Sequence, residues 1–156
     1  MSILKKLFGN RNTSPGDKIG EKIQSMVEIC AEYVGFDTAG VDNIYIFTTI
    51  EESQYVNFCF RIKGEIIKKH RVNDFLVRKV NVDPSAQKSV LDMCNEEVVS
   101  IKEVFKKEGR ELFKHLKIAY DTKTKKMNSS FDYDSLLIGT ELTPHDIEEK
   151  WLDSLK

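Results

Sequence analysis

Long apolar runs and cysteines are both scarce in this sequence. No apolar run approaches the roughly 20 residues that a membrane-spanning helix needs, and MSILKKLFGN lacks the features of a secretory signal. The three cysteines, Cys30, Cys59 and Cys94, are odd in number, widely spaced and placed within apolar patterns. This arrangement predicts buried free thiols and disfavours a disulfide framework or a zinc site. We therefore expect a cytoplasmic protein without stable membrane association.

Net charge is also nearly absent, because 24 Lys and Arg residues face 25 Asp and Glu residues. A protein that binds nucleic acid directly by neutralising phosphates usually carries an excess of positive charge, so that function is disfavoured. The charge is nevertheless uneven, since residues 131–156 contain two basic side chains and seven acidic ones. Such a segment can attract a basic partner, although a solvated helix face is the more common explanation for it.

Residues for catalysis or cofactor binding do not cluster in the sequence. The eight glycines are scattered, so no phosphate-binding loop is visible. His70, His115 and His145 fall in different predicted elements, and none can be placed beside Cys59, which a nucleophilic thiol would require. We expect Cys59 to be a structural thiol and predict no cofactor.

A paired-carboxylate site is the one metal-binding arrangement that the sequence allows. Asp132 and Asp134 are two residues apart on a predicted strand, so they point to one face with Cβ atoms about 7 Å apart. His145 could join them, but hard cations usually take further oxygen ligands, and the next acid is Glu141. A metal-dependent hydrolase built on the two aspartates is therefore the weaker hypothesis, and we expect no metal.

The chain length of 156 residues fits one domain, and the pattern predicts an α+β fold. Residues 1–16 read as a flexible tail, followed by a single domain over 17–156. The expected element order is αβββαββα, with an antiparallel sheet of about five strands packed with helices. The predicted helices cover 17–34, 84 to near 109, and 143–155, and the predicted strands cover 43–50, 54–62, 65–72, 115–121 and 127–134.

The segment FDYDSL at 131–136 continues the alternation of the last predicted strand. Phe131 and Tyr133 are expected to face the core, whereas Asp132 and Asp134 face solvent or a partner. Trp151 is expected to anchor the terminal helix to the core. The basic run KKHR at 68–71 is placed on the third strand, where lysines would protect a sheet edge.

The last third of the chain resembles the YezG-like antitoxins of Gram-positive bacteria. The resemblance is carried by a long helix ending near VFKKEGRELF, then by LKIAYDTKTKKMNSSFDYDSL, and then by TPHDIEEKW. It covers roughly residues 17–156 and is most specific after residue 98. The positions that match the family pattern are Phe131, Asp132, Tyr133, Asp134, Leu136, Thr143, Pro144 and Trp151. The resemblance implies an immunity protein that neutralises a nuclease toxin exported by the type VII secretion system, with no catalytic residues and no cofactor.

The leading hypothesis is therefore an immunity protein that inhibits a toxic nuclease domain by stoichiometric binding. Because nucleases expose basic surfaces to hold phosphates, an acidic partner surface would speed association. The candidate toxin-binding residues are the acids of the last segment: Asp132, Asp134, Glu141, Asp146, Glu148, Glu149 and Asp153. A structural or adaptor module, brought to membranes by the segment Ile3–Phe8, is the alternative from another class. The oligomeric state and the strand order are left open.

Overall fold

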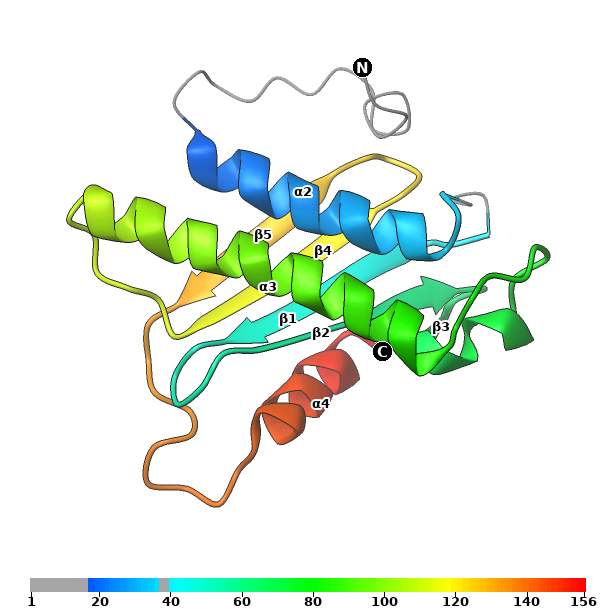
Figure 1. The fold of residues 1–156 in the computed structure, drawn as a ribbon. Helices are drawn as coiled ribbons and strands as arrows, with labels where there is room; N and C mark the ends of the chain where they lie inside the picture. Colours follow the sequence, from blue (N-terminus) through cyan, green and yellow to red (C-terminus); the bar gives the residue numbers. More distant parts are fainter. Residues whose placement is uncertain (1–16, 37–39) are drawn as a thin grey trace.

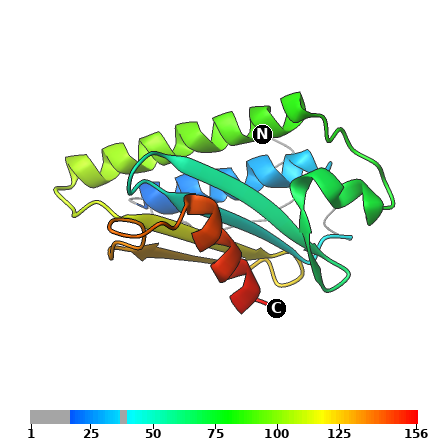
Figure 2. The same cartoon turned by 90° about the horizontal axis from the view of Figure 1, so that it is seen from below.

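The computed structural model describes residues 17–36 and 40–156, so the predicted tail at 1–16 lies outside the described residues. Nine elements follow one another: α2 (Lys18–Tyr33), β1 (Asn43–Thr49), β2 (Tyr55–Ile62), β3 (Glu65–Lys68), the 3-10 helix η1 (Lys69–Asp74), α3 (Pro84–Lys107), β4 (His115–Asp121), β5 (Met127–Asp132) and α4 (Pro144–Ser154). The strands form one antiparallel sheet in the order β3-β2-β1-β4-β5. Helices α2 and α3 cover one face and α4 lies on the other (Figures 1 and 2). The predicted α+β class and element order are confirmed.

The main core lies between the sheet and the α2–α3 layer. Strand β2 alternates as predicted, with Val56, Phe58, Phe60 and Ile62 buried on this face. Helix α3 presents a stripe three and four residues apart, of which Cys94, Val98, Ile101 and Phe105 are buried. This face of the sheet therefore follows directly from the apolar periodicity of the sequence.

Local signals fix where several elements begin. The Asp17 side chain accepts a hydrogen bond from the amide of Gly20 at 2.8 Å and caps α2. Thr143 and Asp146 form a reciprocal capping box at the start of α4, where Pro144 takes a first-turn position. Lys63 and Gly64 turn β2 into β3 with φ angles of 54° and 82°, as a tight hairpin turn demands.

The third strand is shorter than predicted. The sequence predicts a strand over 65–72, but β3 ends at Lys68 and the chain then forms η1. The 3-10 turn buries Val72 in the main core, and the Tyr33 hydroxyl donates to the carbonyl of Lys69 at 2.7 Å. Burial of Val72 thus outweighs extension of the strand. Strand β3 is a sheet edge. The placement of the basic run 68–71 on the third strand holds only for Lys68, because the other three residues lie in η1.

The second face of the sheet is covered by α4 over β1 and β2. The indole ring of Trp151 lies 5.9 Å from the ring of Tyr45 and 6.3 Å from that of Phe47, measured between centroids. Leu152 is buried against Tyr45 and Cys59. Trp151 thus anchors the terminal helix as expected, in a second apolar cluster on the opposite face from the main core.

The three cysteines are free and buried. The sulfur atoms of Cys30 and Cys94 lie 4.0 Å apart between α2 and α3. Burial is the main cause that raises the pKa of the Cys30 thiol and raises that of Cys59 to about 12. Both thiols are therefore protonated at neutral pH. Across residues 17–36 and 40–156, no helix has the length and apolar character needed to cross a membrane.

Candidate protein-binding surface

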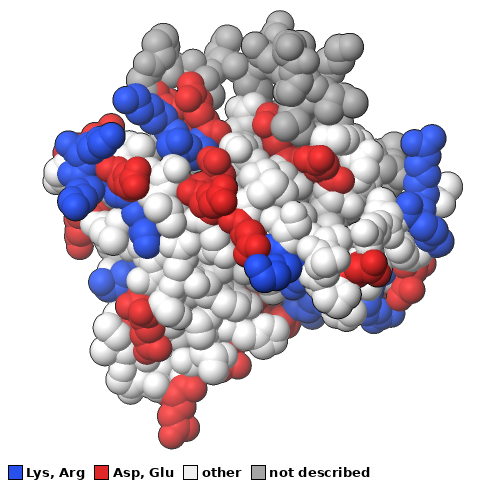
Figure 3. Space-filling model, in the orientation of Figure 1, with Lys and Arg blue, Asp and Glu red and all other residues white. Residues whose placement is uncertain are grey.

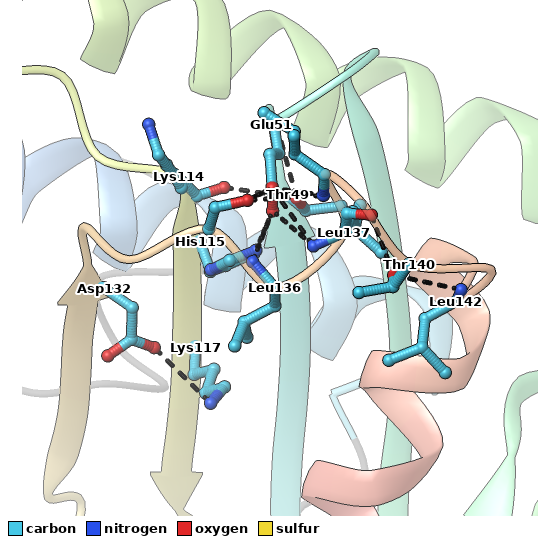
Figure 4. Close-up of polar contacts among 12 residues, drawn as sticks. Thr49, Glu51, Lys114, His115, Lys117, Asp132, Leu136, Leu137, Thr140 and Leu142 are labelled. Carbon is cyan, nitrogen blue, oxygen red and sulfur yellow. Dashed lines mark hydrogen bonds and ion pairs between the residues drawn. The ribbon is translucent and has the colours of Figure 1, made fainter.

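Residues 133–142, which connect β5 to α4, are held in place by one buried side chain. Glu51 stands just after β1, and its carboxylate accepts hydrogen bonds from the amides of Leu136, Leu137 and Ile138 at 3.0, 3.1 and 3.0 Å. The Ser135 hydroxyl donates to the same carboxylate. The Glu51 side chain is only 1% exposed, and Figure 4 shows it enclosed by this segment. We call residues 133–142 the anchored loop.

A buried histidine completes the anchor from the sheet. His115, the first residue of β4, places its Nε2 atom 3.0 Å from the Glu51 carboxylate. Its ring is fully buried and stacks on Phe47 with a centroid distance of 6.5 Å. Leu137 is buried beside Phe47 and carries the loop onto the second face of the sheet. The Nδ1 atom of His115 has no hydrogen-bond partner in the described part of the chain.

The protonation state of Glu51 follows from these contacts. Burial is the largest influence and favours the neutral acid, but the hydrogen bonds from Ser135 and from the amides of Leu136, Ile138 and Leu137 together outweigh it. They lower the pKa of Glu51 to about 2 from an ordinary value of 4.5. The anchor is therefore a carboxylate at neutral pH, when hydrogen bonds to it are strongest.

The anchored loop presents apolar and acidic side chains together on its outer side. Ile138 is 65% exposed, and Tyr133 and Leu136 are each 38% exposed. Asp134 and Glu141 are exposed beside them. On the surface seen in Figure 3, the lowest part carries acidic side chains, whereas the upper part carries both acidic and basic ones. A fixed loop that exposes large apolar groups among charges has the composition of a protein interface.

The predicted acidic residues of this region differ in their surroundings. Asp132, at the end of β5, lies 3.4 Å from the ammonium group of Lys117 (Figure 4). Asp134 and Glu141 are exposed and have no ion pair among the described residues. These two acids therefore lack an ion pair within the described part of the chain, whereas Asp132 is paired but still 41% exposed.

Three more predicted acids, all on α4, have partners within the chain. Asp146 accepts from the amide of Thr143 at 2.9 Å, and this hydrogen bond is the main cause that lowers the pKa of Asp146. Glu149 pairs with Lys68 of the edge strand β3, and Asp153 lies 3.0 Å from Lys156. Their first roles are in capping and docking α4.

The prediction that Glu148 is one of the exposed acids of the last segment is wrong, because its side chain is buried. It is 1% exposed and accepts from the Tyr55 hydroxyl at 2.8 Å and from the Asn57 amide at 3.0 Å. Its position three and four residues before Trp151 and Leu152 puts it on the buried face of the helix. That spacing is the signal that the charge count overlooked.

Of the structural motif residues, Phe131 lies in the main core and the others lie in the anchored loop or in α4. Phe131 packs into the main core, with ring centroids 5.2 Å from Phe105 and 4.8 Å from Phe113, as expected. The prediction that Tyr133 also faces the core is wrong. Strand β5 ends at Asp132, opposite the first residue of β4, so Tyr133 has no strand to pair with and the alternation stops. Leu136, Pro144 and Trp151 lie in the anchored loop and α4.

The two aspartates of the motif do not share a strand face. Asp134 lies in the loop beyond β5, and Asp132 faces Lys117. Within 17–36 and 40–156, no three His, Cys, Asp or Glu side chains group closely enough to hold a metal ion.

The residues that sequence reasoning missed are Glu51 and His115. Glu51 and Glu52 stand side by side in a polar connection, and nothing in that stretch distinguishes them. The contacts of Glu51 join positions 84 to 87 residues apart, which no local pattern reveals. A scan against protein-family models finds no match for this chain, and neither does a search of curated proteins.

Proposed function

We propose that this protein is an immunity protein, which inhibits a cognate nuclease toxin by stoichiometric binding through the anchored loop. The observation that carries the proposal is the loop itself: a segment fixed by a buried carboxylate, exposing Tyr133, Leu136 and Ile138 beside Asp134 and Glu141. The resemblance of the last third of the chain to YezG-like antitoxins points to the same class of function.

Preorganisation is the first physical argument. Ordering a loop upon binding consumes part of the interaction free energy, and that cost falls when the loop is already fixed. Five hydrogen bonds from four consecutive residues hold the Ser135–Ile138 stretch on Glu51. This buried anchor fixes the geometry of the exposed side chains before any partner binds.

Electrostatic complementarity is the second argument. A nuclease domain displays basic groups where it holds phosphates, and opposite charge on an inhibitor raises the association rate. Asp134 and Glu141 lie beside the exposed apolar groups and are unpaired in the described part of the chain. We expect the apolar side chains to provide most of the affinity and the acids to provide speed and selectivity.

The function is tested through the neighbouring reading frame. We expect that frame to encode a large protein with a nuclease-like C-terminal domain. The test expresses this domain in cells with and without the present chain. The purified domain is then assayed for nucleic-acid cleavage with increasing amounts of this chain. We expect protection of the cells and complete inhibition at one equivalent. Failure to bind or to inhibit the domain would remove the proposal.

The contact surface is tested separately with charge-neutral variants. Replacing Asp132, Asp134 and Glu141 with Asn, Asn and Gln should slow association with the toxin by about tenfold at low salt. A control with the same change in net charge replaces three exposed acids of α3, Asp92, Glu96 and Glu103. Stopped-flow or surface binding kinetics provide the rates. Equal slowing in both variants would mean that the acids of the anchored loop have no special part.

The apolar contribution is tested by Ile138→Ser, because this side chain is 65% exposed and buries little in the free protein. We expect the dissociation rate of the toxin complex to rise by about tenfold or more with little change in stability. Val77→Ser is the matched control, since Val77 is 92% exposed and lies outside the loop. An unchanged dissociation rate for Ile138→Ser would place the contact elsewhere.

A further inference from the structure

The outer edge of β5 is an unpaired sheet edge. Strand β5 is the last in the order β3-β2-β1-β4-β5, and among the described residues no segment pairs with its outer side. Natural edge strands are commonly protected by Lys, Pro or a covering element. The other edge, β3, ends in Lys68 and leads directly into a 3-10 helix. Strand β5, with the sequence MNSSFD, contains no Lys, Arg or Pro.

The register shows which backbone groups point outward. In an antiparallel pair, alternate residues exchange hydrogen bonds with the neighbouring strand. The amide of Asp121 donates to the carbonyl of Lys126 at 2.9 Å, so Lys126 and every second residue after it bond inward to β4. The amides and carbonyls of Met127, Ser129 and Phe131 consequently point away from β4. They form a row of three donor–acceptor residues along the edge.

We propose that this edge binds the same edge of a second copy of the protein, giving a symmetric dimer with one continuous antiparallel sheet. The two-fold axis passes at Ser129, which pairs with Ser129 of the partner subunit. Met127 then lies opposite the partner's Phe131, and Lys126 lies opposite the partner's Asp132. A closed two-fold interface of this kind is isologous, so each such contact is made twice.

Charge complementarity selects a second copy as the occupant of the edge. The turn before β5 is basic, with Lys123, Lys125 and Lys126, whereas the strand ends in Asp132 and is followed by Asp134. Antiparallel pairing about Ser129 brings the basic end of each copy against the acidic end of the other. Opposite charges facing across strands stabilise pairing, and like charges oppose it. A parallel arrangement would place basic beside basic and acidic beside acidic.

The side chains allow the strands to approach. Asn128 and Ser130 are small and lie on the second face, where α4 covers β1 and β2. On the other face, Met127 and Phe131 are only partly buried against the main core. Pairing with the second copy would cover them further. This inference does not depend on the proposed function, because it rests on the backbone edge of β5. The two proposals share Asp132 and Asp134, and Ser129→Pro tests the edge without changing either acid.

The first test is the oligomeric state of single-residue variants by sedimentation velocity over a range of concentrations. The chain itself is expected to shift from monomer to dimer as concentration rises. Ser129→Pro removes an outward amide that has no strand partner within residues 17–36 and 40–156, and should give a monomer at every concentration. Ser129→Thr keeps the amide and should still dimerise. Circular dichroism and thermal unfolding verify that both variants are folded.

The second test uses exchanged charges to establish the register. Lys126→Glu alone and Asp132→Lys alone each place like charges opposite one another, and each should weaken self-association by about tenfold. Mixed in equal amounts, the two variants form heterodimers in which both pairs are again of opposite charge. The mixture should therefore associate about as well as the original chain. A purely structural defect in either variant would not be repaired by mixing.

The proposal is overturned by either of two results. One is a chain that stays monomeric at its highest soluble concentration. The other is a dimer that persists in Ser129→Pro, or that the mixed charge variants fail to restore, since that dimer would use another surface. Toxin inhibition by the monomeric Ser129→Pro variant, measured in the same preparations, keeps this result separate from the proposed function.

Discussion

Glu51 and Glu52 are chemically identical neighbours with opposite surroundings. Glu52 is exposed, whereas Glu51 is buried against amides of the anchored loop and His115. Substitution of a buried carboxylate by an amide keeps its shape, removes its charge and turns a donor toward the loop amides. Hydrogen bonds to a buried charge are each stronger than neutral ones. A single side chain accepts hydrogen bonds from four consecutive residues of the anchored loop, Ser135 to Ile138.

The Glu51→Gln variant should lose about 3 kcal/mol of unfolding free energy. The adjacent Glu52→Gln variant should lie within about 0.5 kcal/mol of the original chain. Urea denaturation measures both values. Hydrogen exchange should show faster exchange of the amides of Leu136, Leu137 and Ile138 in Glu51→Gln only. If the two variants had equal stability and exchange, the anchor would have no energetic role.

The same residue predicts a dependence of stability on pH. The pKa of Glu51 is lowered to about 2 in the folded protein from an ordinary value of 4.5, so the unfolded chain binds more protons between these values. Stability from this group is complete above pH about 4.5 and is lost as the pH falls toward about 2. The difference in unfolding free energy between the original chain and Glu51→Gln should therefore shrink from pH 5 to pH 2.5. A difference that stayed constant over this range would contradict the assignment.

Some single residues were predictable and others were not, for a physical reason. The Asp17 cap and the Thr143–Pro144 helix start depend on contacts within four residues, which a sequence displays directly. Glu51 depends on a loop more than 80 positions away. Tyr133 was misassigned because alternation shows which way side chains point but not where the partner strand begins.

At the scale of elements, α4 is the one helix on the second face, within the described residues. Its docking combines apolar contacts of Trp151 and Leu152 with a buried acid, Glu148, that bonds Tyr55 and Asn57 of β2. Burying a carboxylate is costly unless its hydrogen bonds are made. The polar contacts therefore favour the orientation of α4 about its own axis in which Glu148 faces the sheet. Periodicity predicted the helix and its Trp anchor. Counting charges concealed that one acid faces inward.

Removal of the indole should uncouple α4 from the sheet. Trp151→Ala leaves a gap between the rings of Tyr45 and Phe47 and should cost about 3–4 kcal/mol of unfolding free energy. Lys150→Ala, on the exposed side of the same helix, should change it by less than about 0.5 kcal/mol. Denaturant unfolding monitored by circular dichroism measures both, because the tryptophan itself is lost. Equal effects would argue against docking through the indole.

At the scale of the whole molecule, the proposed dimer and the proposed toxin-binding surface have a joint consequence. The anchored loop begins directly after β5, so pairing about Ser129 places the two loops at opposite ends of the paired strands. Eight residues separate Tyr133 from the partner's Tyr133 along the ladder, or about 26 Å at the rise of an extended strand. Each loop of the dimer should then bind its own toxin domain.

Light scattering of the purified complex should therefore give the mass of two immunity chains with two toxin domains. The Ser129→Pro variant should give one of each, with inhibition retained. A complex of one copy of the original chain with one toxin domain would show that the β5 edge and the toxin contact overlap.

The division of the sheet into two unequal faces also has a consequence during synthesis. The main core is built from residues 19–131, so its parts are all available before residues 132–156 leave the ribosome. Several side chains that pack on the rings of Tyr45 and Phe47 follow position 136, namely Leu137, Ile147, Trp151 and Leu152. A nascent chain thus carries a completed helical layer on one side and a partly uncovered aromatic face on the other. We infer that this interval is when the chain is most exposed to aggregation, and that a released chain truncated just before residue 136 would remain in that state.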